Sequence, residues 1–171
     1  KNQFEEFDYS KINTHFNGYG FYFDTEETGS QAYGDIVYKS FVNLENPLIR
    51  DASNPDVKVL TIDDTRNFLA EIDNRDNAKY SDHRTLDKLR ESIVENDRFT
   101  HKYEPELLDV NAISDIVWNN ASRDNDIVDY IIEVSGGDAK SGLDALRAAT
   151  GYDGFIVKYG PKSWEVVAWF P

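Results

Sequence analysis

Cysteine and methionine are both absent from the 171 residues of the chain. Without cysteine, disulfides, thiolate-bound metals and thiol nucleophiles are excluded. The absence of methionine includes the first position, which is Lys1. We therefore expect a fragment, a processed product or an excised domain of a larger polypeptide.

Long apolar runs and an excess of basic residues are absent too. No stretch approaches the ~20 apolar residues of a membrane-spanning helix, and the start does not have the pattern of a secretion signal. The 32 acidic residues outnumber the 18 Lys and Arg residues, giving a formal net charge of −14. Since nucleic-acid binding depends on clustered basic side chains, we expect no nucleic-acid partner. We also expect a soluble, monomeric domain without a membrane partner.

The sequence does contain enough apolar residues for one folded domain, with 40% hydrophobic and 13% aromatic residues. Near the start, alternation predicts a strand in which Phe21 and Phe23 share one face and Tyr22 lies on the other. A loop is expected before it, over 13–20. Thr25 predicts the N-cap of a short helix after it.

Further strands are predicted after this first one and at the end of the chain. β-branched and aromatic residues predict a strand over 36–44, closed by Pro47. Two apolar runs over 154–159 and 165–170, separated by Gly160 and a proline, predict a hairpin. We expect this hairpin to lie beside the 36–44 strand.

Apolar residues recur at helical spacing between positions 61 and 150. The four or five short helices predicted there contain 62–72, 86–93, 105–117, 126–134 and 143–149. Pro105 suits a first helical residue, and Gly151 suits a helix end. Because strands resume directly afterwards, we predict a single α+β domain, 1–171, with a split β core and a helical insertion over about 61–150. A separately folding helical subdomain is the alternative.

Several apparent motifs do not meet the requirements of their chemistry. Acidic pairs such as Asp63 and Asp64 lack the pattern of a calcium loop and are interpreted as solvated helix ends. The run GGDAKSG, residues 136–142, has Ala139 where a phosphate loop needs glycine, and is interpreted as a turn. The three histidines lack metalloprotease spacing, and no G-x-S-x-G nucleophile elbow occurs. No metal site is predicted.

Two features remain as candidates for a site. Residues 18–33, GYGFYFDTEETGSQAY, combine glycines with aromatic rings, which suggests that a flat group binds there. Glu165 begins an apolar strand, where an unpaired carboxylate is costly. The alternatives are that Tyr22 and Tyr33 are core aromatics and that Glu165 faces solvent at a strand end.

Four blocks in the order GYGFYFDTEETGSQAY, VYKSFVNLENPLIRD, GYDGFIVKYG and WEVVAWFP carry a resemblance to a known family. Their order resembles the ADP-ribosyltransferase domains of phage polyvalent proteins and related bacterial toxins. These domains belong to the His-Tyr-Glu group, together with diphtheria toxin and the poly-ADP-ribose polymerases. The match spans both β portions, whereas the helical middle carries little signal, and it implies the split β core of that fold.

The resemblance implies a nicotinamide site in the first block. Gly20, Tyr22 and Phe23 match the G-x-Y-F block of the family, whose tyrosine packs against the nicotinamide of NAD. Ser30 matches the residue that hydrogen-bonds the nicotinamide amide. Tyr33 matches the second ring, which stacks on the other side.

Glu165 matches the catalytic glutamate of the family, which begins a strand reading E-x-V-V-x-x-P and binds the ribose 2′-hydroxyl. The resemblance thus implies an NAD-dependent ADP-ribosyltransferase with NAD as substrate, no metal and a protein acceptor, in which Glu165 and Tyr22 are catalytic. It also implies a cytoplasmic setting, for a phage-encoded protein or a delivered toxin. Two other functions stay open: a non-catalytic interaction module with this fold, and an NAD glycohydrolase that uses water as acceptor.

One motif of the family has no counterpart in the chain. A His-Gly-(Ser/Thr) strand precedes the segment that residues 2–12 resemble, and its histidine holds the NAD ribose. His15 lies in the following loop and does not align with it. In an active parent chain, we expect that motif directly upstream of Lys1.

Overall fold

The computed structural model describes residues 7–8, 12, 14–15, 17–26, 39–54, 57–78, 85–95, 108–136 and 138–170. Contacts divide the chain into two compact units. Lys1–Pro55 and Tyr152–Pro171 form one unit, here called the sheet unit, and Asp56–Gly151 form the other, the helical unit. Helices and a mixed sheet are both present, which confirms the α+β class.

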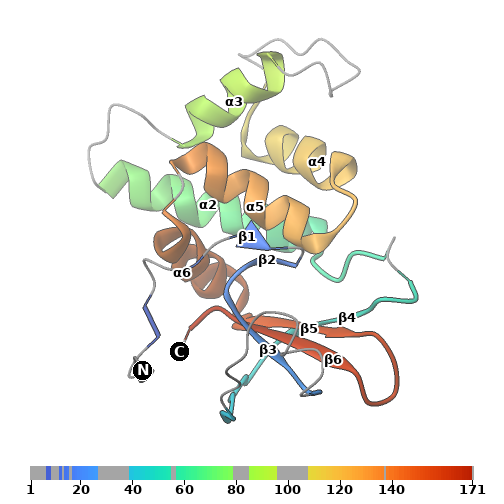
Figure 1. The fold of residues 1–171 in the computed structure, drawn as a ribbon. Coiled ribbons are helices and arrows are strands. Elements are labelled where there is room, and N and C mark those ends of the chain that lie inside the picture. Colours follow the sequence, from blue (N-terminus) through green and yellow to red (C-terminus); the bar gives the residue numbers. More distant parts are fainter. Residues whose placement is uncertain are drawn as a thin grey trace. The chain divides into compact units, whose positions relative to one another are not determined.

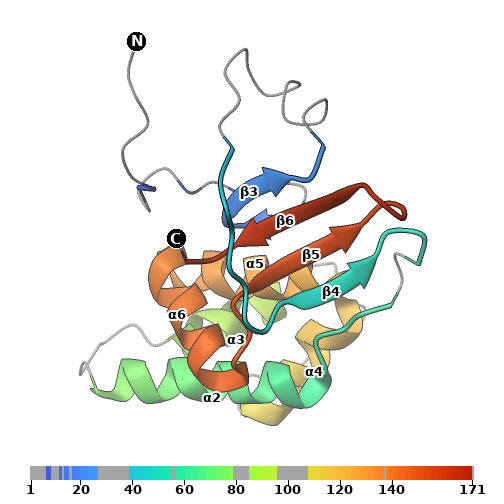
Figure 2. The same cartoon turned by 90° about the horizontal axis from the view of Figure 1, so that it is seen from below.

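The sheet unit contains a four-stranded mixed sheet and a small two-stranded one. The strands are β1 (Thr14–His15), β2 (Gly18–Tyr19), β3 (Phe21–Asp24), β4 (Leu48–Asp51), β5 (Gly154–Lys158) and β6 (Trp164–Ala168). β1 pairs with β2, and the larger sheet has the order β3-β6-β5-β4, which Figure 2 shows side by side. Its pairs are antiparallel except β4 with β5, which run parallel.

The predicted C-terminal hairpin is confirmed as β5 and β6. The amide of Tyr159 donates to the carbonyl of Ser163 at 2.9 Å and closes the loop. Thr25 ties β3 to the same loop end, because its hydroxyl accepts from the amide of Trp164 at 2.9 Å. The amide of Glu26 donates to the Asp24 carboxylate at 2.7 Å, and the short helix predicted after Thr25 lies outside the described residues.

The strand predicted over 36–44 is wrong for its described part, because residues 39–44 are not in a strand. The edge strand beside the hairpin is instead β4, which begins after Pro47. A buried carboxylate explains the change: Asp153 accepts the amides of Glu45 at 2.6 Å and Asn46 at 3.2 Å. This contact turns the chain before Pro47, so that pairing starts afterwards. The loop predicted over 13–20 is also wrong, since β1 and β2 form there.

The two faces of the larger sheet differ in burial. Leu48, Phe155 and Val167 share one face and are buried. The opposite face carries Ile49, which is 46% exposed. There the Phe7 ring packs edge-on against Phe21 and Phe23, with centroid distances of 4.9 and 5.5 Å. The prediction that Tyr22 faces away from these two phenylalanines agrees with the strand register.

The helical unit contains five described helices (Figure 1). They are α2 (Ile62–Ala78), α3 (Thr85–Glu95), α4 (Val110–Asn120), α5 (Asp124–Ser135) and α6 (Ala139–Thr150). α2 packs against α4 and α6, and α3 packs against α5. The predicted apolar spacing is confirmed by the buried side chains, among them Phe68, Leu69, Leu89, Ile93, Ile113, Ile127, Ile131, Leu143 and Leu146.

The helix ends follow from local capping chemistry. Asp109 caps α4 by accepting the amide of Ala112 at 2.8 Å, so the predicted start at Pro105 is wrong. Asp138 caps α6, which begins within GGDAKSG, and the turn prediction is therefore wrong for residues 139–142. Gly151 ends α6 in the left-handed conformation, as predicted, with φ 79°.

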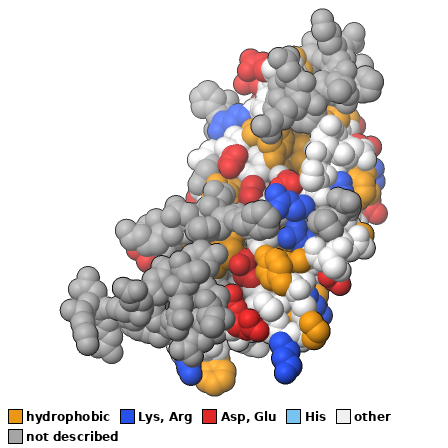
Figure 3. All heavy atoms as spheres, turned by 45° about the vertical axis from the view of Figure 1, so that its right-hand side comes forward, with side chains coloured by type: hydrophobic (Ala, Val, Ile, Leu, Met, Phe, Trp, Pro, Cys, Tyr) orange, Lys and Arg blue, Asp and Glu red, His pale blue; other side chains and the backbone are white. Residues whose placement is uncertain are grey.

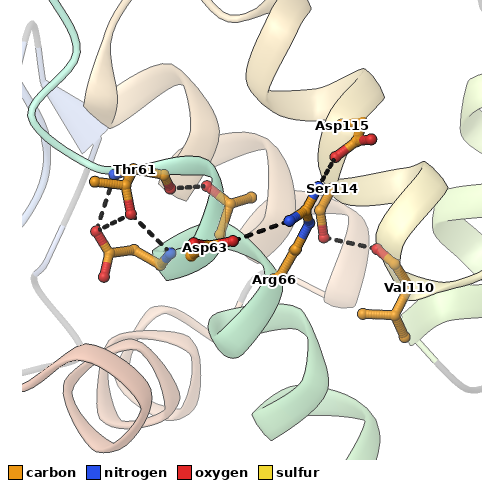
Figure 4. Close-up of polar contacts among 8 residues, drawn as sticks. Thr61, Asp63, Arg66, Val110, Ser114 and Asp115 are labelled. Carbon is orange, nitrogen blue, oxygen red and sulfur yellow. Dashed lines mark hydrogen bonds and ion pairs between the residues drawn. The ribbon is translucent and has the colours of Figure 1, made fainter.

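Arg66 of α2 forms two ion pairs, one within α2 and one that links α2 to α4 (Figure 4). Its guanidinium contacts Asp63 at 2.9 Å and Asp115 at 2.7 Å. Next to Asp115, the hydroxyl of Ser114 donates to the carbonyl of Val110 at 2.6 Å. The predicted solvated position of Asp63 is consistent with its 78% exposed side chain.

Lys58 fixes the segment that leads into α2. Its ammonium donates to the carbonyls of Trp118 and Ala121 at the end of α4 and lies 3.9 Å from the centre of the Trp118 ring. Burial lowers the pKa of Lys58, while the carboxylates of Asp124 and Asp126 act in the opposite direction.

Among the described side chains visible in Figure 3, acidic and basic groups are interspersed and apolar atoms form small separate groups. None of the helices in the part of the chain that the structure describes is long and apolar enough to cross a membrane.

Candidate functional site

The strand register brings four polar side chains to one face of the larger sheet. Asp24 of β3 pairs with Glu165 of β6, Glu165 pairs with Val157 of β5, and Val157 pairs with Arg50 of β4. Residues paired directly across a sheet have side chains on the same face, and so do residues two apart along a strand. Asp24, Glu165, Arg50 and Tyr22 therefore share the face that carries the buried apolar residues.

Asn17 connects these side chains. It lies in the turn between β1 and β2 and is 2% exposed. Its Nδ2 donates to Glu165 Oε1 and, at 3.1 Å, to the hydroxyl of Tyr159. Its Oδ1 accepts from Nη2 of Arg50 at 2.8 Å. The turn thus holds a four-residue hydrogen-bond network with Glu165 at its edge.

Arg50 is the most costly member of this network. It is 7% exposed, and its Nε has no hydrogen-bond partner among the described residues. No described carboxylate lies within ion-pair distance of its guanidinium. A buried charge without a counter-ion is strongly unfavourable, so the single amide contact with Asn17 is unusual.

Donor and acceptor chemistry fixes the orientation of the Asn17 amide. Arg50 can only donate, so the amide oxygen faces it. An ionised glutamate can only accept, so the amide nitrogen faces Glu165. The two ends of Asn17 are therefore matched to a cation on one side and a carboxylate on the other. Among the described residues, only Oε1 of Glu165 receives a hydrogen bond.

Tyr22 reaches the same turn through its hydroxyl. The hydroxyl donates to the carbonyl of Gly18 at 2.5 Å and accepts from the amide of Asn17 at 3.2 Å. Tyr22 pairs with Val167, two residues from Glu165 on β6. The structure therefore brings together Tyr22 and Glu165, the two predicted catalytic residues, with Asn17 in contact with both.

Gly20 has a structural reason to be glycine. Its φ is 154°, and a Cβ at this position would overlap Cγ1 of Val167 and lie 3.0 Å from the carbonyl oxygen of Ala168. The backbone of Gly20 thus lies directly against β6, just before β3 begins.

The other predicted nicotinamide-binding residues are not brought to this network. Phe23 lies on the opposite face of the sheet, against Phe7. Ser30 and Tyr33 lie outside the described residues.

Sequence reasoning missed Asn17, Arg50 and Tyr159. Asn17 directly precedes the glycine- and aromatic-rich stretch, but nothing in its local sequence indicates contact with residue 165. Arg50 lies two residues after the buried Leu48, on the same face of β4, and this pattern becomes informative only once β4 is assigned as a strand.

Within the residues that the structure describes, no group of three or more His, Asp or Glu side chains is arranged to hold a metal ion. A scan against protein-family models finds no match for this chain. Searches of the curated proteins and of the solved structures find no match either.

Proposed function

We propose that the chain is an NAD-dependent ADP-ribosyltransferase domain in which Glu165 acts on the ribose and Tyr22 packs against the nicotinamide. One observation carries the proposal. Tyr22 and Glu165, which lie far apart in the sequence and match the catalytic residues of the family, share one face of the sheet and a common hydrogen-bond partner in Asn17. The resemblance of four sequence blocks to the family supplies the reaction. The acceptor in this proposal is a protein side chain.

The chemistry needs few groups. The bond between ribose C1′ and the nicotinamide nitrogen breaks, and its electron pair leaves with nicotinamide. The acceptor forms a bond to C1′ and loses a proton. The ribose passes through a positively charged, oxocarbenium-like state, as at other glycosidic bonds. A carboxylate aimed at the ribose stabilises charge that is greatest in that transition state.

The site has features that suit these roles. The Glu165 carboxylate is tied through Oε1, and no described residue donates to its Oε2. Oε2 is therefore suited to accept a hydrogen bond from a ribose hydroxyl. The hydroxyl of Tyr22 is bonded to the backbone of the turn, which fixes the direction of its ring. A ring with a fixed direction is suited to orient a flat leaving group.

The test is nicotinamide release from NAD by the wild type and by Glu165→Gln. We expect Glu165→Gln to lower the rate by about 10²- to 10⁴-fold, with NAD still bound, because the substitution removes charge and keeps size. Glu133→Gln, an exposed position on α5, is the matched control and keeps the wild-type rate. Circular dichroism verifies that both variants are folded.

Other outcomes separate the alternatives. If the wild type neither releases nicotinamide nor binds NAD saturably, the proposal is wrong. The network around Asn17 would then be a clamp between a turn and a sheet, which favours a non-catalytic interaction module. If nicotinamide release yields free ADP-ribose and no modified protein, the activity is that of an NAD glycohydrolase.

A further inference from the structure

We propose that Asn17 is a positioning residue for the Glu165 carboxylate and that Arg50 fixes the orientation of the Asn17 amide. The kinetic part of this inference rests on the proposed function. The structural part rests on the hydrogen-bond geometry alone and can be tested in a protein without any activity.

The spacing of the strands explains why an intermediate residue is needed. Arg50 and Glu165 are on the same face but on strands separated by β5. Neighbouring strands are about 4.8 Å apart, so these two backbones are separated by about 10 Å. Asn17, from the turn between β1 and β2, bridges this interval with its amide, accepting from Arg50 and donating to Glu165.

Arg50 gives the Asn17 amide a direction. Without a donor at its oxygen, an amide can rotate by half a turn and present that oxygen to Glu165, where it would repel the carboxylate. Burying Arg50 with no described partner for its Nε is hard to explain by stability, because apolar replacements of buried charges are often neutral or stabilising. A role in holding the Asn17 amide accounts for that cost.

Asn17 in turn limits the freedom of the carboxylate. A glutamate has three rotatable side-chain bonds, and a hydrogen bond to one oxygen selects one arrangement before substrate binds. Groups that are already oriented do not lose that entropy during the reaction. Asn17 contacts no reacting atom in this scheme, and its effect passes through Glu165.

The kinetic experiment compares Asn17→Ala and Asn17→Asp with the wild type in nicotinamide release. We expect kcat to fall roughly 10- to 100-fold, with KM for NAD changed less than about twofold, because orientation of the carboxylate affects the transition state. Tyr159→Phe removes the other acceptor of the Asn17 amide and leaves the bond to Glu165. It is the matched control, with a much smaller effect.

Arg50 is tested by a pair of substitutions. Arg50→Lys keeps a donor for the Asn17 oxygen and retains most of kcat, whereas Arg50→Met removes the donor and lowers kcat to the level of Asn17→Ala. A merely structural role predicts instead that both variants lose activity in proportion to the unfolded fraction. That result, or wild-type kcat in folded Asn17→Ala, overturns the inference.

A double-mutant cycle gives the readout that does not require activity. Asn17→Ala removes the donor to Glu165 and Glu165→Ala removes the acceptor, and each change should lower the melting temperature. The double variant should lose clearly less than the sum of the two losses, because both changes remove the same hydrogen bond. If the two changes are additive, Asn17 and Glu165 are not coupled, and the inference is wrong whether or not the wild type cleaves NAD. If they are coupled but nicotinamide release is absent, the proposed function fails and the structural inference stands.

Discussion

The two units of this molecule are stabilised by contacts of different sequence range. In the sheet unit, Asn17 bonds to Glu165 across 148 positions and Thr25 bonds to Trp164 across 139. In the helical unit, the described side-chain bonds reach 69 positions, between Arg75 and Asp144. Many of its polar contacts lie within one or two helical turns. The polar contacts of the helical unit therefore join residues closer in the sequence, whereas those of the sheet unit join residues from opposite ends of the chain.

Two arginines illustrate the same difference. Arg66 in the helical unit is partly exposed and has two carboxylate partners. Arg50 in the sheet unit is buried and has one amide partner among the described residues. Surface pairs such as those of Arg66 contribute little to stability, whereas a buried, poorly compensated charge is retained at a cost. The two arginines thus differ in burial and in the groups that compensate their charge.

The largest effect should come from Gly20→Ala. The added Cβ overlaps Val167 and the φ of 154° is strained for alanine, so we expect the sheet unit to lose about 2–4 kcal/mol. Hydrogen exchange, read separately for β5 and for α2, measures this. Exchange in β5 should accelerate while α2 stays protected.

Gly160→Ala is the matched control for this change, because no atom lies within 4 Å of a Cβ at that position. It should leave both units as they are. Equal acceleration of exchange in β5 and α2 of Gly20→Ala would show that the two units lose structure together.

An intermediate effect should come from Asp124→Ala in the helical unit. The Asp124 carboxylate accepts the amide of the fully buried Leu60 at 2.6 Å. Its removal leaves that amide unpaired, at about 1–3 kcal/mol. Asp124→Asn keeps an acceptor and should lose less. Urea unfolding followed by far-UV circular dichroism measures both, and equal losses would contradict the role of the Leu60 bond.

The smallest effect should come from Arg66→Met. The substitution keeps the apolar stem and removes two partly exposed ion pairs, so the melting temperature should fall by about 2 °C or less. In 1 M salt the difference from the wild type should shrink further, because salt screens such pairs. A loss of melting temperature several times larger at both salt concentrations would contradict this prediction, because Arg66 would then contribute as much to stability as a buried arginine.

The helices could be predicted because their signals are local. Apolar spacing identified all five described helices, and Gly151 marked the end of α6. The errors occurred where another short-range signal prevailed: Asp109, rather than Pro105, begins α4. The edge strand could not be predicted in this way. The stretch 39–44 has residues that favour strands, yet Asp153, over 100 positions away, turns the chain and gives the edge to β4.

The candidate site was predictable in part. Glu165 and Tyr22 could be singled out by their surroundings and by the family resemblance, and the register places them on one face. Asn17 and Arg50 could not, because an asparagine in a turn and an arginine beside a proline-led strand are ordinary in sequence. Their significance depends on a strand order that no short stretch of sequence specifies.

The discontinuity of the sheet unit has a consequence for synthesis on the ribosome. β3 emerges early, but its partner β6 follows roughly 140 residues later, which at about 5–20 residues per second means a wait of about 7–30 s. The helical unit, Asp56–Gly151, is fully synthesised before β6. During that interval the phenylalanines of β3 have no partner strand. The Asn17–Glu165 contact can form only after β6 has been synthesised, so a chain cut short before residue 165 cannot make it.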